Sequence, residues 1–366
     1  MKNPAIVAGK EIAVVTTAYG KVRGYMHTGM YTFKGIPYGT ARRFMPPEKT
    51  ASWEGIRSSM TYGPTCPSPE SDVFRDEYEF PLNRSHGYYI NENCLNLNIW
   101  SKKVNGTERK PVMVYLHGGG FSSGSSVEFP SLDGENLSRN QPELYNFGLE
   151  WGPVHDGDLL PYQPVEPAAA KLSDHIPLLV GSCKNEYMPF TPGLNDLSME
   201  AVNAGLQKKY GDKTAVYLSA VEKAYPQTIE PADYIDIDFL FRPLVIKQAN
   251  QKSKTGYAPV YVYLFAWQSP VLDGTYKAFH TMDLPFVFNN IARCEEMTGG
   301  GQKACQMADK MSEAWIQFAR TGNPNCKKIP DWPKYTIING ATMILDNTCE
   351  VKYHHDKELL SIAMGQ

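Results

Sequence analysis

"VMVYLHGGGFSSG", residues 112–124, runs from apolar and β-branched residues through a histidine into three consecutive glycines. An apolar run that ends in glycines is typical of a buried strand followed by a loop with little side-chain bulk. Such a loop can present backbone N–H groups to a developing negative charge, as an oxyanion hole requires. The stretch therefore predicts a strand that carries an anion-stabilising loop at its end.

The composition is that of a globular chain able to bury a large core. Of its 366 residues, 42% are hydrophobic and 20% are charged, and the net charge is -3. No basic stripe or block of like charge favours nucleic acid as a partner, and no apolar run approaches the ~20 residues that span a bilayer. The sequence also lacks HExxH, paired CxxC, GxGxxG and P-loop motifs, so no metal or nucleotide cofactor is expected.

The cellular compartment is left open by two observations. The opening stretch, residues 1–15, lacks the core and cleavage site of a signal peptide, so the protein is either cytoplasmic or exported with its signal removed. The seven cysteines favour export, because six of them flank short loops; the alternative is reduced, buried thiols. The pairs suggested by proximity alone are Cys66 with Cys94, Cys294 with Cys305, and Cys326 with Cys349, leaving Cys183 unpaired.

Strand and helix patterns alternate along the chain. The first third is β-rich, beginning with two short strand patterns on either side of Tyr19 and Gly20. Later segments predict strands over 176–182, 258–267 and 341–346, and a helix over 198–211 with Ser198 as its N-cap. A further helix carries one apolar stripe and stops at Gly322; the stripe is Met307, Met311, Trp315 and Phe318. Strands interleaved with helices predict an α/β layered fold.

Nine motifs resemble those of the type B carboxylesterase and cholinesterase family of α/β-hydrolases, and they occur in the family's order. They are FKGIPYG (33–39), RFMPP (43–47), Trp53, NENCLNLNIW (91–100), HGGGFSSGSS (117–126), GPVHDGDLLP (152–161), PLLVGSCKNEY (177–187), HTMDLPFVF (280–288) and FARTGNPN (318–325). The resemblance implies one α/β-hydrolase domain over residues 1–366. That domain has a mixed, mostly parallel central sheet flanked by helices, after an N-terminal antiparallel β region.

The resemblance also implies a serine esterase that cleaves uncharged carboxylic esters through an acyl-enzyme. His280 matches the family's catalytic histidine and Glu186 the acid that orients it, while Gly119 and Gly120 match the oxyanion donors. Without the resemblance, a glutamate after a strand is usually a solvated loop residue, and a lone histidine is usually structural. Four aromatic residues near these positions either line a substrate pocket or fill the core: Phe190, Trp267, Phe286 and Phe288.

The nucleophile has no convincing position in this chain. The only GxSxG match, Gly120–Gly124, lies inside the oxyanion loop, so Ser122 is not expected to be the nucleophile. In relatives, the segment after the counterpart of residues 134–140 carries central strands and the serine, whereas here Gln141 follows Asn140 at once. Removing about three central strands would leave a gap of roughly 14 Å in the sheet. We therefore expect a segment of the protein to be omitted between Asn140 and Gln141.

A second class of function fits the same motifs. The resembled family includes adhesion and scaffold members that keep the fold without a working triad, and the lack of a serine agrees with that alternative. Glu186, His280 and the glycine loop are all present, however, and such members do not need to keep them together. The expected partner is therefore a small-molecule ester, and the alternative is a non-catalytic binding scaffold.

Overall fold

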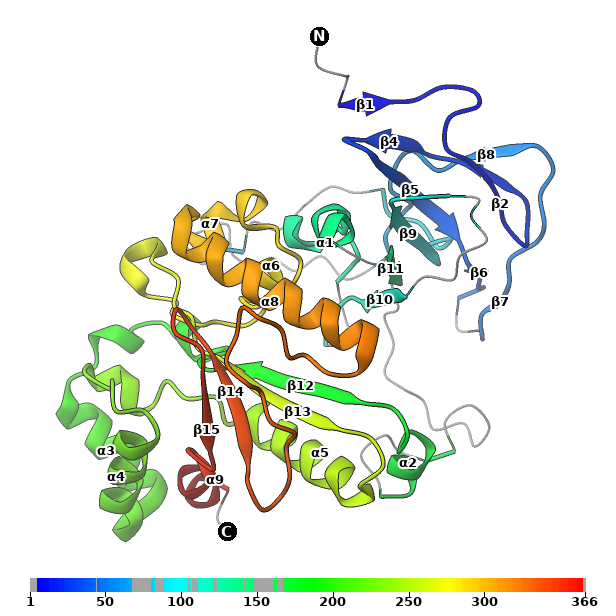
Figure 1. Ribbon diagram of the computed structural model, residues 1–366. Helices are drawn as coiled ribbons and strands as arrows, with labels where there is room; N and C mark the ends of the chain where they lie inside the picture. The colour runs from blue at the N-terminus through cyan, green and yellow to red at the C-terminus, as the bar shows by residue number, and fades with distance from the viewer. Residues whose placement is uncertain are drawn as a thin grey trace. The chain divides into compact units, whose positions relative to one another are not determined.

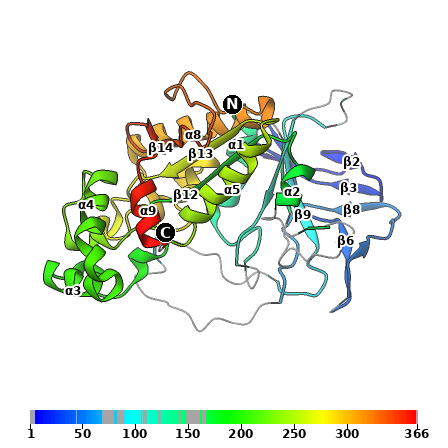
Figure 2. The same cartoon turned by 90° about the horizontal axis from the view of Figure 1, so that it is seen from below.

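The computed structural model describes residues 5–43, 45–67, 80–82, 89–104, 106, 111–120, 124–140, 143–147, 161–162 and 167–364. It contains two compact units, one formed by residues 1–153 and 284–296, the other by residues 154–283 and 297–366. Figures 1 and 2 show the elements of both units in two views, and each unit is described by itself below. The expected organisation as one domain stays a prediction.

The first unit is built on a six-stranded sheet in the order β1-β4-β5-β9-β11-β10. Neighbouring strands are antiparallel from β1 to β11, and β10 and β11 are parallel. This confirms the antiparallel β region expected at the N-terminus. The strands are β1 (Ile6–Val7), β4 (Tyr25–His27), β5 (Met30–Pro37), β9 (Asn96–Ser101), β10 (Val112–Leu116) and β11 (Glu143–Phe147).

Smaller elements complete this unit, and one of them is the predicted hairpin. Strands β2 and β3 pair antiparallel, and the N–H of Thr17 donates to the Gly20 carbonyl at 2.9 Å across the turn. The remaining elements are β2 (Val14–Thr16), β3 (Lys21–Arg23), β8 (Ile56–Ser58), β6 (Gly39–Thr40), β7 (Glu48–Lys49), η1 (Pro130–Leu132), α1 (Glu135–Asn140), α6 (Leu284–Val287) and η7 (Ile291–Arg293). Helix α7 (Glu295–Thr298) spans the boundary between the units.

The second unit has a four-stranded sheet in the order β12-β13-β14-β15. The first three strands are parallel and β15 is antiparallel to β14. The strands are β12 (Leu178–Cys183), β13 (Val260–Phe265), β14 (Ala341–Leu345) and β15 (Glu350–Tyr353). The helices are α2 (Pro167–Leu172), α3 (Met199–Tyr210), α4 (Thr214–Ala224), α5 (Arg242–Thr255), α8 (Gly301–Thr321) and α9 (Lys357–Ala363), with short turns η2 (Met188–Phe190), η3 (Leu194–Asp196), η4 (Gly211–Lys213), η5 (Pro231–Tyr234) and η6 (Val271–Gly274).

Strand β13 shows why this unit is layered. Successive side chains of a strand point to opposite faces. Val260 and Val262 pack with residues of α5, while Tyr261 and Tyr263 meet rings of α8 with centroids 6.3 and 5.1 Å apart, those of Phe318 and Trp315. Helices α5 and α8 therefore cover the two faces of the sheet (Figure 1), which confirms the α/β layering expected from the sequence.

The predicted helix signals are confirmed at both of the long helices named above. The Ser198 hydroxyl caps α3 by accepting the N–H of Ala201 at 3.2 Å, and Gly211 is the C-cap of that helix. Helix α8 ends at Gly322, whose φ of 71° lies in the left-handed region that glycine adopts without strain.

The two main sheets each end in an edge strand made of residues typical of a sheet interior. Among the described strands, β10 pairs only with β11, and β12 pairs only with β13. On β10 the alternating side chains Val112, Val114 and Leu116 are 49%, 52% and 57% exposed. Parallel strands are normally buried on both faces, so such an edge is unusual for this class of sheet.

Candidate active site

Glu186 lies just beyond the end of β12, in a backbone conformation that is unusual for glutamate. Its φ is 45°, in the left-handed region, and the residue is buried. One carboxylate oxygen, Oε1, accepts the N–H of Cys183 at 2.7 Å, which fixes the side chain against the strand end. Left-handed non-glycine residues cost free energy and persist where surrounding contacts hold them, often at functional sites.

His280 is attached to Glu186 at two points. The backbone N–H of His280 donates to the Glu186 carbonyl at 2.9 Å, and the imidazole Nδ1 lies 2.6 Å from Oε2 of the same residue. Because the carboxylate accepts, Nδ1 carries the proton, and Nε2 of the neutral ring keeps a lone pair. The imidazole is 35% exposed and the carboxylate 7% exposed. The pair therefore offers a proton acceptor whose orientation is set by a buried charge.

Two aromatic rings hold the plane of this imidazole. The Tyr187 ring stacks on it with centroids 4.3 Å apart, and the Phe241 ring lies nearly parallel at 5.6 Å. Stacked rings restrict rotation of His280 without hydrogen bonding to either ring nitrogen. The imidazole is thus constrained by its carboxylate partner and by ring packing.

Asn185 links three segments around the pair. Its side-chain amide donates to the Asp236 carbonyl at 3.0 Å, and its oxygen accepts the N–H of Ala278 at 3.2 Å. The backbone N–H of Asn185 also donates to the Ala278 carbonyl at 3.2 Å. The residue is 1% exposed, so water does not replace these contacts. Asn185 therefore clamps the loop that carries Glu186 to the segment that carries His280.

A second carboxyl group, which is half-buried, lies near the pair. Asp283 accepts the hydroxyl of Tyr263 at 3.1 Å. Burial, together with the nearby charge of Glu186, raises the pKa of Asp283 to about 6. Asp283 and Tyr263 were not predicted as site residues. The only sequence signal is the position of Asp283 three residues after His280.

The glycine loop belongs to the first unit. Gly119 and Gly120 have φ values of 123° and 59°, and open space surrounds the position of a Cβ at Gly120. The neighbouring His117 donates from Nδ1 to the Gly118 carbonyl at 2.7 Å. These backbone conformations explain why glycines occur here. The role of Gly119 and Gly120 as oxyanion donors stays a prediction.

The four aromatic residues differ in their surroundings. Trp267, Phe286 and Phe288 are each less than 5% exposed, whereas Phe190 is half-buried and lies edge-on to Phe279 at 5.6 Å. The burial of the first three favours the alternative that they fill the core. Their role in a substrate pocket stays a prediction.

The remaining expectations from the sequence concern the break in the chain, the cysteine pairs, a metal site and a membrane span. Ser122 and Gln141 lie outside the described residues, so the expected break after Asn140 stays a prediction, as does the pairing of Cys66 with Cys94. The expected pairs Cys294 with Cys305 and Cys326 with Cys349 are not formed, because Cys305, Cys326 and Cys349 are free thiols in the structure. Among the described residues, no group of three histidine, cysteine, aspartate or glutamate side chains is arranged to hold a metal ion. No helix in that part of the chain combines the length and apolar character needed to cross a bilayer.

Comparison with known proteins agrees with this architecture. The model of the carboxylesterase family matches residues 11–146 and 135–362. An esterase from Clostridium hathewayi, described as able to hydrolyse aliphatic aromatic polyesters, is 24% identical with a TM-score of 0.81, over 98% of this chain and 99% of that one. A carboxylesterase of Geobacillus stearothermophilus is 22% identical with a TM-score of 0.75, over 96% and 99%. The fold is that of an α/β-hydrolase.

Within that class the chain belongs to the carboxylesterase family, because the family model covers most of its length. The para-nitrobenzyl esterase of Bacillus subtilis (strain 168) is 26% identical over 492 positions, which cover 94% of this chain and 96% of the relative. These matches support ester hydrolysis as the class of reaction. Because 492 positions exceed the 366 residues here, at least 126 of them have no counterpart in this chain.

Proposed function

We propose that Glu186 and His280 are the acid and base of a serine carboxylesterase whose substrates are uncharged carboxylic esters. The observation that carries the proposal is the 2.6 Å contact between Nδ1 of His280 and the buried carboxylate of Glu186. This contact leaves Nε2 as the proton acceptor and stabilises the imidazolium that forms when Nε2 takes a proton. A serine triad needs that arrangement of acid and base.

In the proposed reaction, Nε2 of His280 takes the proton of a serine hydroxyl as its oxygen attacks the ester carbonyl. The oxyanion is stabilised by N–H groups of Gly119 and Gly120, and His280 then gives its proton to the leaving alcohol. Water attacks the acyl-enzyme by the same proton transfers, which releases the acid and restores the serine. Glu186 stays ionised throughout.

We further propose that the serine lies in a segment omitted between Asn140 and Gln141. Three observations support this. The two matches of the family model overlap at residues 135–146, around this junction, and the alignment with the Bacillus relative contains at least 126 positions without counterpart here. The edge strands β10 and β12, with exposed Val112 and Val114 on the former, are consistent with sheets that lack neighbouring strands.

A fluorophosphonate probe, which labels activated serines covalently, tests the proposal. The 366-residue chain should remain unlabelled, and Ser122→Ala should change nothing. Protein isolated from its source should yield additional peptides between Asn140 and Gln141 and should be labelled within them. His280→Ala in that protein should abolish both labelling and hydrolysis of para-nitrophenyl acetate. Normal hydrolysis by the His280→Ala variant would refute the assigned base.

A non-catalytic binding scaffold is the second candidate. Neuroligin-2 of Rattus norvegicus is 32% identical over 160 residues, which are 32% of this chain and 18% of that protein. If the source protein also lacks a segment after Asn140 and resists the probe, the scaffold function is favoured. Labelling inside an additional segment favours the esterase.

A further inference from the structure

A cavity of about 520 Å³ opens in the second unit beside the loop that carries Glu186. One wall is a face of α3, where Ala201, Gly205 and Lys209 recur at the spacing of successive turns. Another part of the wall is the segment that follows η5, from which Ile235 and Ile237 line the cavity. Its size lies within the range of ~300 to 1,000 Å³ that is usual for small-molecule sites.

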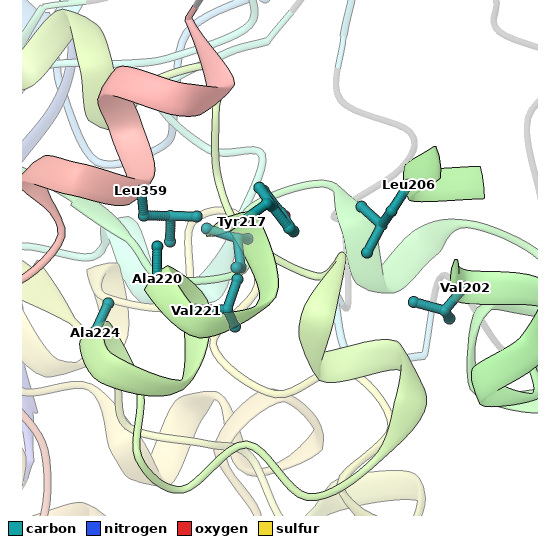
Figure 3. Close-up of a cluster of buried hydrophobic side chains, with 8 residues drawn as sticks. Val202, Leu206, Tyr217, Ala220, Val221, Ala224 and Leu359 are labelled. Atoms are coloured by element: carbon teal, nitrogen blue, oxygen red, sulfur yellow. The ribbon is translucent and has the colours of Figure 1, made fainter. Parts of the chain in front are cut away.

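The floor of this cavity belongs to a packed apolar cluster. Val202 and Leu206 of α3, Tyr217 of α4 and Ile237 are shared between the lining and that cluster. Figure 3 shows the first three of them with other members of the cluster. Because their neighbours are close-packed, these side chains do not close the space by small shifts. The cavity is therefore preformed and mostly apolar.

Most polar groups along the lining are satisfied within the protein. Glu186 is engaged by His280 and by the N–H of Cys183, and Asn185 by two backbone groups. The carboxylate of Asp238 accepts the N–H groups of Leu240, Phe241 and Arg242 at 2.7–2.9 Å. None of these groups therefore needs a ligand to complete its hydrogen bonds.

Two groups of the lining are exceptions. The buried hydroxyl of Tyr210 has no hydrogen-bond partner among the described residues. The other exception is Lys209. Its ammonium lies 5.0 Å from the centroid of the Tyr210 ring and 5.7 Å from that of Phe239, and both residues line the cavity. No carboxylate of the described residues forms an ion pair with it. The two rings hold the cation at the cavity, where its charge lacks an acidic partner among those residues.

We propose that this cavity binds a medium-chain alkyl carboxylate, with the chain against the apolar walls and the carboxylate at Lys209. The apolar lining selects the chain, and the single unpaired cation selects a negative head group over a neutral or positive one. The acidic residues Glu186 and Asp238 disfavour an anion at their end of the cavity, which sets the orientation of the ligand. Binding requires neither His280 nor a nucleophile, so it can be measured on this chain whether or not the chain hydrolyses esters.

Calorimetric titration with sodium decanoate, below the concentration at which it forms micelles, tests the site. Gly205→Phe should abolish binding, because the space around the Cβ position at Gly205 is open and the new ring would fill the cavity. The fold should survive, since glycine is the poorer helix former. Gly205→Leu provides a second filling variant, and thermal unfolding checks that both fold.

The head group is tested separately. Lys209→Met should weaken decanoate about fivefold, the most expected for an exposed charge pair. Lys208→Met, in the same last turn of α3 but outside the lining, should leave the affinity unchanged. Decanol and decyltrimethylammonium should bind more weakly than decanoate to the unmodified protein. Absence of saturable decanoate binding, equal binding by the Gly205→Phe variant, or equal binding of all three compounds would overturn the proposal.

Discussion

Replacing Asn185 by leucine should lower the stability of the fold and also disturb the hydrogen bond between Glu186 and His280. Leucine has a similar size but cannot donate to the Asp236 carbonyl or accept the N–H of Ala278. Because Asn185 is only 1% exposed, water would not replace the lost partner of either backbone group. Each buried, unsatisfied group costs about 1–3 kcal/mol, so the variant should lose about 2–6 kcal/mol of unfolding free energy.

Most of the expected range of loss is smaller than the usual stability of ~5 to 15 kcal/mol, so the variant should remain folded under mild conditions. Urea unfolding measures the loss. Proton NMR of the His280 imidazole then reports on its Nδ1–H, which should lose its strongly hydrogen-bonded, downfield resonance as the loop carrying Glu186 loosens.

Asn290→Leu is the matched control. Asn290 is equally buried, lies in the first unit, and donates to the carbonyls of Ser131 and Asp133, each at 2.7 Å. Its replacement should lower stability by a similar amount but leave the His280 resonance unchanged. The reasoning fails if Asn185→Leu changes stability by less than about 1 kcal/mol or if both variants alter the His280 signal alike.

Two further predictions concern ionisable side chains of the second unit. Because the pKa of Asp283 is raised to about 6, the folded state binds this proton more tightly than the unfolded chain, and stability should fall by about 3 kcal/mol as pH rises from about 4 to about 6. Asp283→Asn should remove that part of the slope in urea unfolding, and an unchanged slope would contradict the assignment. Arg242 donates from Nε to Asp356 at 2.7 Å, and both side chains are at most 5% exposed. Arg242→Met should therefore cost about 3–5 kcal/mol, and adding Asp356→Leu should recover much of it, whereas an additive second loss would argue against the buried pair.

The elements that could be predicted from the sequence are those with local signals. The Ser198 cap, the stop at Gly322 and the strand predicted over 258–267 depend on residues close in sequence. Each is found in the structure, the strand as Val260–Phe265. Glu186 and His280 were identified through the resemblance of their flanking motifs. Neither residue type alone distinguished a catalytic group from a structural one.

What escaped prediction depends on contacts between distant parts of the chain. The side chain of Asn185 bonds to residues 51 and 93 positions away, and no local pattern marks those partners. The raised pKa of Asp283 follows from burial, which a short motif does not encode. The cavity beside α3 likewise needs that helix to pack against residues 235–240.

The double attachment of His280 to Glu186 has a consequence for interpreting substitutions at position 186. The main-chain link to the Glu186 carbonyl, 2.9 Å long, does not involve the glutamate side chain. Truncating the carboxylate should thus remove the negative charge while the histidine's backbone stays anchored. The position of the histidine and the charge of its carboxylate partner, which are usually lost together, can therefore be measured separately in this protein.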